Sequence, residues 1–156
     1  MADSDEIFLA SDEALDVIAG RVAEVLGLEY LADMTAQTGE LQYKGRGRTF
    51  EGWMGVFIGP NTFEPEPGEV QAMDRYPVVV DVQCRGHKSA QAEETRVAFE
   101  LLTVGLPEVP ALLSHNVERL VAASRPGLGI HYFGEKVWLD PPEVEPWRPW
   151  VLMADD

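Results

Sequence analysis

The chain has 156 residues, of which 27 are Asp or Glu and 12 are Lys or Arg, so its formal net charge is −15 at pH 7. A chain of this length can bury a core without disulfides or metal ions, which predicts a single domain over residues 1–156. So strong a negative field repels nucleic-acid phosphates and anionic membranes and attracts basic proteins. We therefore expect a partner that is a basic protein, and neither nucleic acid nor a membrane.

The N-terminus and the cysteine content favour a cytoplasmic protein. No apolar run approaches the ~20 residues of a membrane-spanning helix, and residues 1–9 carry acids where a secretory signal has positive charge. The single Cys84 has no partner for an internal disulfide. The sequence predicts that Cys84 is a small buried hydrophobe on a strand.

The first third of the chain predicts a frayed lead followed by a helix. Residues 1–10 are acidic, and we expect them to be flexible. A helix is predicted over 12–26, with Ser11 as its N-cap and Gly27 as a left-handed C-cap. Its buried stripe has the three- and four-residue spacing of one helical face, and consists of Leu15, Ile18, Val22 and Val25.

The middle of the chain has the composition of strands and one long loop. Strands are predicted at 30–35, near Leu41 and Tyr43, at 50–58 and, with the clearest alternation, at 77–84. Residues 60–75 are rich in Pro and acids and predict an exposed loop.

The last part of the chain mixes helix, strand and irregular structure. A helix capped by Ser89 is predicted to end at Gly105, and residues 110–124 fit either a helix, which we favour, or a hairpin turning at His115-Asn116. Residues 130–133 and 136–139 predict a hairpin. The tail 141–156 contains four prolines and two tryptophans, and we expect it to run extended.

These elements predict an α+β fold. Short connections between strands imply antiparallel pairing, so we expect a two-layer sandwich with a mostly antiparallel sheet of about five strands and two or three helices on one face. This order and the charge resemble those of small acidic secretion chaperones and toxin-neutralising immunity proteins. The likeness is one of architecture and charge without a shared motif, so it assigns no family.

The sequence lacks the short motifs of common catalytic and cofactor sites. It contains no P-loop, no dinucleotide-binding glycine pattern, no Gly-x-Ser-x-Gly and no paired cysteines. Cys84 and His87 lie close in sequence, but strand alternation turns Asp81 away from Cys84. His115 and His131 have no partner that the sequence reveals. We therefore predict no catalytic residue, no metal and no cofactor.

Two sets of residues are candidate binding sites. The basic run of Lys44, Arg46 and Arg48, with glycines between, predicts an anion site, or alternatively a flexible tip that balances nearby acids. The second set predicts contacts to a protein partner, and consists of Glu64, Glu66, Glu69, Asp74, Trp147 and Trp150. The alternative for the two tryptophans is that they dock on the core of their own domain.

Three functions fit these observations. The first is a non-enzymatic acidic binding protein, of the inhibitor, immunity or chaperone type, that engages a basic protein. The second is a small enzyme or ligand-binding domain with an apolar pocket between sheet and helices, lined by Trp53, Phe57, Tyr132 and Trp138. The third is a subunit of a homo-oligomer, such as a homodimer paired through a strand edge at 29–35 or 136–139.

Overall fold

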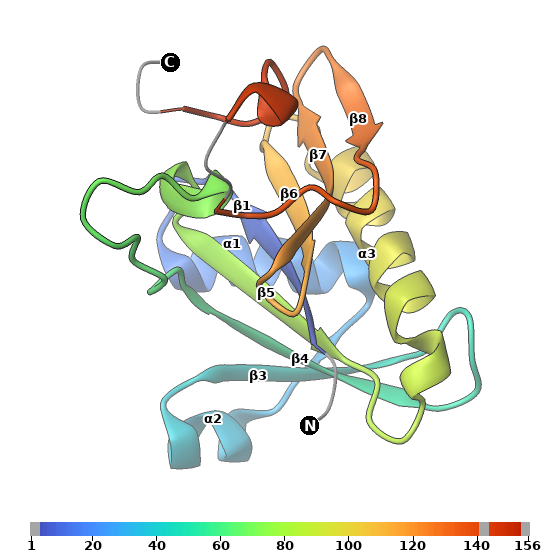
Figure 1. Ribbon diagram of the computed structural model, residues 1–156. Coiled ribbons are helices and arrows are strands. Elements are labelled where there is room, and N and C mark those ends of the chain that lie inside the picture. Colours follow the sequence, from blue (N-terminus) through green and yellow to red (C-terminus); the bar gives the residue numbers. More distant parts are fainter. Residues whose placement is uncertain (1–3, 141–143, 154–156) are drawn as a thin grey trace.

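The computed structural model describes residues 4–140 and 144–153. Within them the chain forms one antiparallel sheet of eight strands in the order β2-β3-β4-β5-β1-β6-β7-β8 (Figure 1). The strands are β1 (Asp5–Leu9), β2 (Glu29–Tyr30), β3 (Leu41–Arg46), β4 (Trp53–Pro60), β5 (Val78–Gln83), β6 (Ala111–His115), β7 (Arg119–Arg125) and β8 (Gly129–Tyr132). The helices are α1 (Leu15–Leu26), α2 (Ala32–Thr38) and α3 (Gln91–Gly105). The α+β class is confirmed, but the expected number of about five strands is wrong.

The strand β1 corrects the prediction that residues 1–10 are a frayed lead. It lies in the middle of the sheet between β5 and β6, and all five of its residues are buried. Ile7 and Leu9 face one core and Phe8 faces another, so the strand has apolar partners on both sides. A strand buried on both faces lacks the alternation of apolar and polar residues that identifies a strand in a sequence. The acids Asp5 and Glu6 also made this segment resemble an exposed one.

The helices α1 and α3 pack on the same face of the sheet, as expected. The inward residues of β5, Val78, Val80 and Val82, join this first core with the apolar stripes of both helices. The left-handed C-cap of α1 at Gly27 is confirmed, with φ 66°. The start of α1 is corrected: it begins at Leu15 and its N-cap is Ala14, not Ser11.

A second core lies on the opposite face of the sheet and is built without regular helices. It combines Phe8 of β1 with residues of β6, β7, the segment 72–76 and the C-terminal segment. Trp147 is fully buried in it, and its indole N–H donates to the carbonyl of Trp138 (3.1 Å). Because these segments cover β1, β6 and β7, they leave the half of this face over β3, β4 and β5 open (Figure 1).

Three further predictions of local structure are wrong. Residues 30–35 divide between the end of β2 and α2 instead of forming a strand. Residues 110–124 form the hairpin β6–β7, which had been the less favoured alternative. Residues 130–139 do not form the predicted hairpin, because β8 pairs with β7. Within residues 136–139, Trp138 makes an isolated bridge to Arg119. For residues 110–124, pairing of β6 with the distant strand β1 outweighed the local helical pattern.

We predict that Trp147→Ala lowers the free energy of unfolding by about 3–5 kcal/mol, because it empties a fully buried aromatic site. Urea denaturation followed by far-UV circular dichroism measures this loss. Trp53→Ala is the matched control: its side chain is 50% exposed, so its truncation should cost less than half as much. Equal losses for the two variants would contradict the docking of the C-terminal segment.

Candidate functional site

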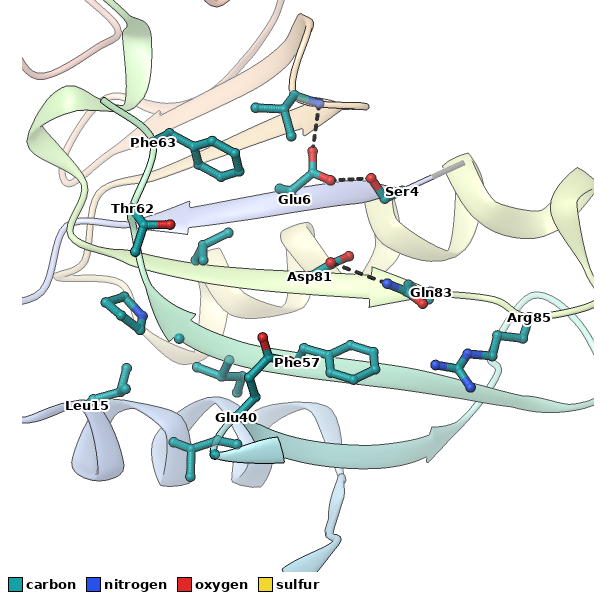
Figure 2. A pocket seen from close by; sticks show the side chains of 17 residues that line it. Ser4, Glu6, Leu15, Glu40, Phe57, Thr62, Phe63, Asp81, Gln83 and Arg85 are labelled. Carbon is teal, nitrogen blue, oxygen red and sulfur yellow. Dashed lines mark hydrogen bonds between the residues drawn. The ribbon is translucent and has the colours of Figure 1, made fainter. Parts of the chain in front are cut away.

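A cleft of about 640 Å³ lies on the open half of the second sheet face, where β4, β5 and β1 run side by side (Figure 2). Its walls come from these strands, from the segment 59–63 and from residues 39–41 before and at the start of β3. Three carboxyl groups line it, those of Glu6, Glu40 and Asp81. The other side chains labelled in Figure 2 include the rings of Phe57 and Phe63 and the polar groups of Ser4, Thr62, Gln83 and Arg85.

Glu6 holds one wall of the cleft in place. Its side chain is buried on β1, and Oε1 accepts hydrogen bonds from the Val117 N–H and the Ser114 hydroxyl (both 2.9 Å). Its Oε2 accepts from the Ser4 hydroxyl (2.6 Å). Val117 has φ 53°, a left-handed conformation that is strained for a β-branched residue. The hydrogen bond to Glu6 therefore stabilises an unfavourable turn.

Among the carboxyl groups that line the cleft, Asp81 has a buried oxygen without a hydrogen-bond partner in the described part of the chain. It lies directly opposite Glu6 in the β1–β5 register. Its Oδ1 is buried and has no hydrogen-bond partner among the described residues, while Oδ2 receives only a long contact from the Gln83 amide (3.4 Å). Burial, and then the negative charge of Glu6, raise the pKa of Asp81 to about 6. A positive charge in the cleft would favour the ionised form of Asp81 and so counteract this rise in its pKa.

Aromatic rings flank the carboxyl groups. Phe57 lies opposite Asp81 in the β4–β5 register. The Arg85 guanidinium lies 5.9 Å from the Phe57 ring centroid, so the cleft already holds one cation of its own chain, and this cation forms no ion pair with Asp81 among the described residues. Toward the other end, Phe63 contacts Phe8 edge to face at 6.1 Å between centroids. Carboxylates beside aromatic faces form a suitable environment for an organic cation.

The opposite face of β1 carries an Asp–His pair that the sequence did not reveal. Asp5 Oδ1 lies 2.5 Å from His115 Nδ1. The Asn116 side-chain amide nitrogen lies 3.2 Å from His115 Nε2, an arrangement that suits the tautomer in which Nε2 accepts from the amide and Nδ1 donates to Asp5. Both ring nitrogens thus have a hydrogen-bonding neighbour, which gives His115 a structural role at the β6–β7 turn.

The predicted anion-binding residues Lys44, Arg46 and Arg48 line one open pocket of about 400 Å³, together with Glu29 and Trp53. Lys44 forms an ion pair with Glu29 (3.1 Å), and both Lys44 and Arg46 lie within 4.9 Å of the Trp53 ring centroid. The Arg48 guanidinium instead donates to the carbonyl of Leu26 (2.7 Å), at the end of α1.

The loop that follows this basic run is ordered by a buried acid. Glu94 on α3 is fully buried, and its Oε1 accepts from the backbone N–H groups of Arg48 and Thr49 and from the Thr49 hydroxyl. These hydrogen bonds anchor residues 48 and 49, and the ion pair of Lys44 with Glu29 balances one nearby acid, as the alternative for this segment expects.

The residues predicted to contact a partner divide into two groups. Glu64, Glu66 and Glu69 are exposed on the loop beside the cleft. Asp74 is also exposed but accepts from the Gln71 N–H (2.9 Å) as part of a short 3₁₀ turn. Among the tryptophans, Trp147 is buried, and Trp150 stacks on His131 with centroids 4.3 Å apart. Both rings thus contact their own domain, as the alternative proposed.

The pocket predicted between sheet and helices is occupied by packed core side chains. Of its four predicted lining residues, only Phe57 lines the cleft, on the face away from α1 and α3. Trp53 lies on that face at the start of β4. Tyr132 at the end of β8 and Trp138, which bridges to Arg119 of β7, are half-exposed.

No reactive cluster forms around Cys84. Its thiol is buried, and burial raises its pKa to about 11, so it is not a thiolate at neutral pH. His87 stacks against Phe50 at 4.6 Å between centroids. Within the described part of the chain, no three His, Cys, Asp or Glu side chains are arranged to hold a metal ion. None of the described helices is long and apolar enough to cross a membrane.

Comparison with known proteins returned no matching family model, no matching curated protein and no matching solved structure.

Sequence reasoning missed Glu6, Glu40, Asp81 and Gln83 as members of one site. One signal was present, because Asp81 is the only acid within the apolar run 77–84. Acids are seldom buried without a partner, so an acid in such a strand indicates a candidate site. Glu6 gave no comparable signal, because the acids before it made it look like part of an acidic lead.

We predict that Asp81→Asn stabilises the fold at pH 8 more than at pH 4.5. The pKa of Asp81 is higher in the folded than in the unfolded chain, so ionisation above pH 6 opposes folding, and this penalty disappears as the pH falls below the unfolded value of about 4. The difference between the two pH values should be about 1–2 kcal/mol, after reduction for partial solvent screening. Urea denaturation of wild type and variant at both pH values measures it, and equal effects would contradict the raised pKa.

We predict that Glu6→Gln lowers the free energy of unfolding by about 2–3 kcal/mol, because an amide cannot accept all three hydrogen bonds that the buried carboxyl group receives. Chemical denaturation at pH 7 measures the loss. Glu64→Gln, on the exposed loop, is the control and should change stability by less than 0.5 kcal/mol. A loss for Glu6→Gln as small as this would mean that the turn does not depend on Glu6.

Proposed function

We propose that this chain is a non-enzymatic, cytoplasmic binding protein that engages a basic protein partner, and that the cleft receives a cationic side chain of that partner. The observation that carries the proposal is the state of Asp81, a carboxyl group with an unpartnered buried oxygen and a raised pKa beside Glu6. A lysine or arginine side chain supplies the missing donor and the missing positive charge in one step.

The surroundings of Asp81 support this proposal. Glu40 adds a third negative charge, and Phe57 offers a ring on which the stem or the guanidinium of the incoming side chain can lie. The net charge of −15 and the exposed acids of the loop 62–70 attract basic partners at long range and speed their encounter.

The hydrogen bonds of Glu6 favour binding over catalysis. Two carboxyl groups in one cleft, one of them with a raised pKa, resemble an acid–base pair. A general base needs a free oxygen within reach of a substrate, but both oxygens of Glu6 already accept hydrogen bonds from Ser4, Ser114 and Val117. The pair therefore lacks the second catalytic group.

Isothermal titration with a ten-residue arginine-rich peptide tests the proposal. We expect binding at 50 mM NaCl that weakens at least tenfold at 300 mM and at least tenfold in Asp81→Asn. At pH 6 binding should release protons, because the arriving cation lowers the pKa of Asp81; titration in two buffers of different ionisation enthalpy measures this release.

Two controls separate the cleft from the general charge of the protein. The same peptide with citrulline in place of arginine keeps its shape but loses its charge and should not bind. Glu93→Gln removes one exposed charge on α3, away from the cleft, and should keep near wild-type affinity. If Glu93→Gln weakens binding as much as Asp81→Asn, the peptide responds to net charge alone and the cleft is not the site.

A further inference from the structure

The open sheet face carries two features of opposite charge at its two ends. One is the basic patch, formed by Lys44, Arg46 and Trp53 at the junction of β3 and β4. The other is the acidic loop, residues 62–70, which contains Glu64, Glu66 and Glu69 and follows the far end of β4. Figure 1 shows the connections before and after β4 at opposite ends of the strand.

The basic patch has binding capacity that its own chain does not use. The Trp53 side chain is 50% exposed, although the patch lies on an otherwise strongly acidic protein. Arg46 is exposed and forms no ion pair with a carboxyl group among the described residues. Lys44 pairs with Glu29, so Arg46 is the cation of the patch that has no carboxylate partner within the described part of the chain. An exposed indole beside such a cation suits a segment that presents carboxylates and apolar surface together.

The acidic loop has that chemistry. The run Glu64-Pro65-Glu66-Pro67 alternates carboxylates with prolines, which favour an extended conformation that docks on aromatic rings at low entropic cost. All residues from 62 to 70 are exposed, including the apolar Phe63 (40%) and Val70 (45%).

The loop does not reach the patch of its own chain. The seven residue steps from Trp53 to Pro60 along β4 span about 23 Å at the usual rise of a strand. A two-fold axis through the middle of this face would relate two copies of the chain. It would place the basic patch of each copy against the acidic loop of the other.

We propose that two copies of this chain associate face to face about such an axis, with the acidic loop of each copy bound to the basic patch of the other. The net charge of each copy opposes association at a distance. At 150 mM salt, charges farther apart than about 8 Å are largely screened, and contacts between adjacent groups decide the outcome. The cleft lies between the copies in this dimer, so self-association excludes the basic partner.

This proposal stands apart from the proposed function, because self-association is measured with no partner present. Sedimentation velocity of the full chain from 5 to 500 µM in 150 mM NaCl should show a concentration-dependent dimer. Arg46→Glu and Glu66→Arg should each weaken dimerisation at least tenfold. Both positions are exposed, and circular dichroism verifies that each variant keeps the fold.

Mixing the two variants gives the decisive test. In a heterodimer of Arg46→Glu with Glu66→Arg, each interface half again joins opposite charges, so an equimolar mixture should regain the association that either variant alone has lost. Glu93→Arg, a charge reversal on α3 away from this face, is the control and should dimerise at least as well as wild type. A monomer at 500 µM, a dimer that neither variant weakens, or a mixture that fails to regain association overturns the proposal.

Discussion

Two consecutive carboxyl groups, Asp5 and Glu6, are buried on opposite faces of the central strand, and the arrangement of the sheet depends on how they are satisfied. Asp5 binds His115 on the helical face, and Glu6 binds Ser114 and Val117 on the other. A buried carboxyl group without such partners costs several kcal/mol. The partners of both acids lie at or beside the β6–β7 turn, so this turn is held next to the start of β1. The position of the turn fixes how β6 and β7 join the sheet.

That constraint also positions the cleft. The β1–β5 register places Glu6 opposite Asp81 and so brings two carboxyl groups into one wall, and only Glu6 finds enough hydrogen-bond donors. Glu6 takes the hydroxyl and N–H groups of the turn, so Asp81 is left with a distant amide. The electrostatics of the site thus follow from an unequal distribution of hydrogen-bond donors across one pair of strands.

The unequal coverage of the second sheet face explains why the cleft is open at all. The C-terminal segment and residues 72–76 build a core over β1, β6 and β7 around Trp147. They do not extend over β3 and β4, whose outward residues include the half-exposed Trp53 and the cations beside it. A sheet face that is apolar at one side and polar at the other gives the molecule one packed half and one open half.

The sequence by itself determined the elements whose signals are local. The helix α1 with its Gly27 cap, the alternating strand β5, the helix α3 and the acidic loop all follow from periodicity and turn chemistry over a few residues. The N-caps expected at Ser11 and Ser89 are wrong, because the N-caps of α1 and α3 are Ala14 and Ala90. The net charge and the lack of short catalytic motifs were equally readable.

Only the tertiary structure decided the features that join distant residues. β1 became the central strand because β5 and β6 supply partners 70 to 110 residues away, and the hairpin 111–125 formed because Glu6 and Ser4 bind its turn. The cleft arises in the same way, from Glu6, Glu40 and Asp81 on three separate segments. Local pattern carries no information about such pairings, since the energies that select them come from contacts across the sheet.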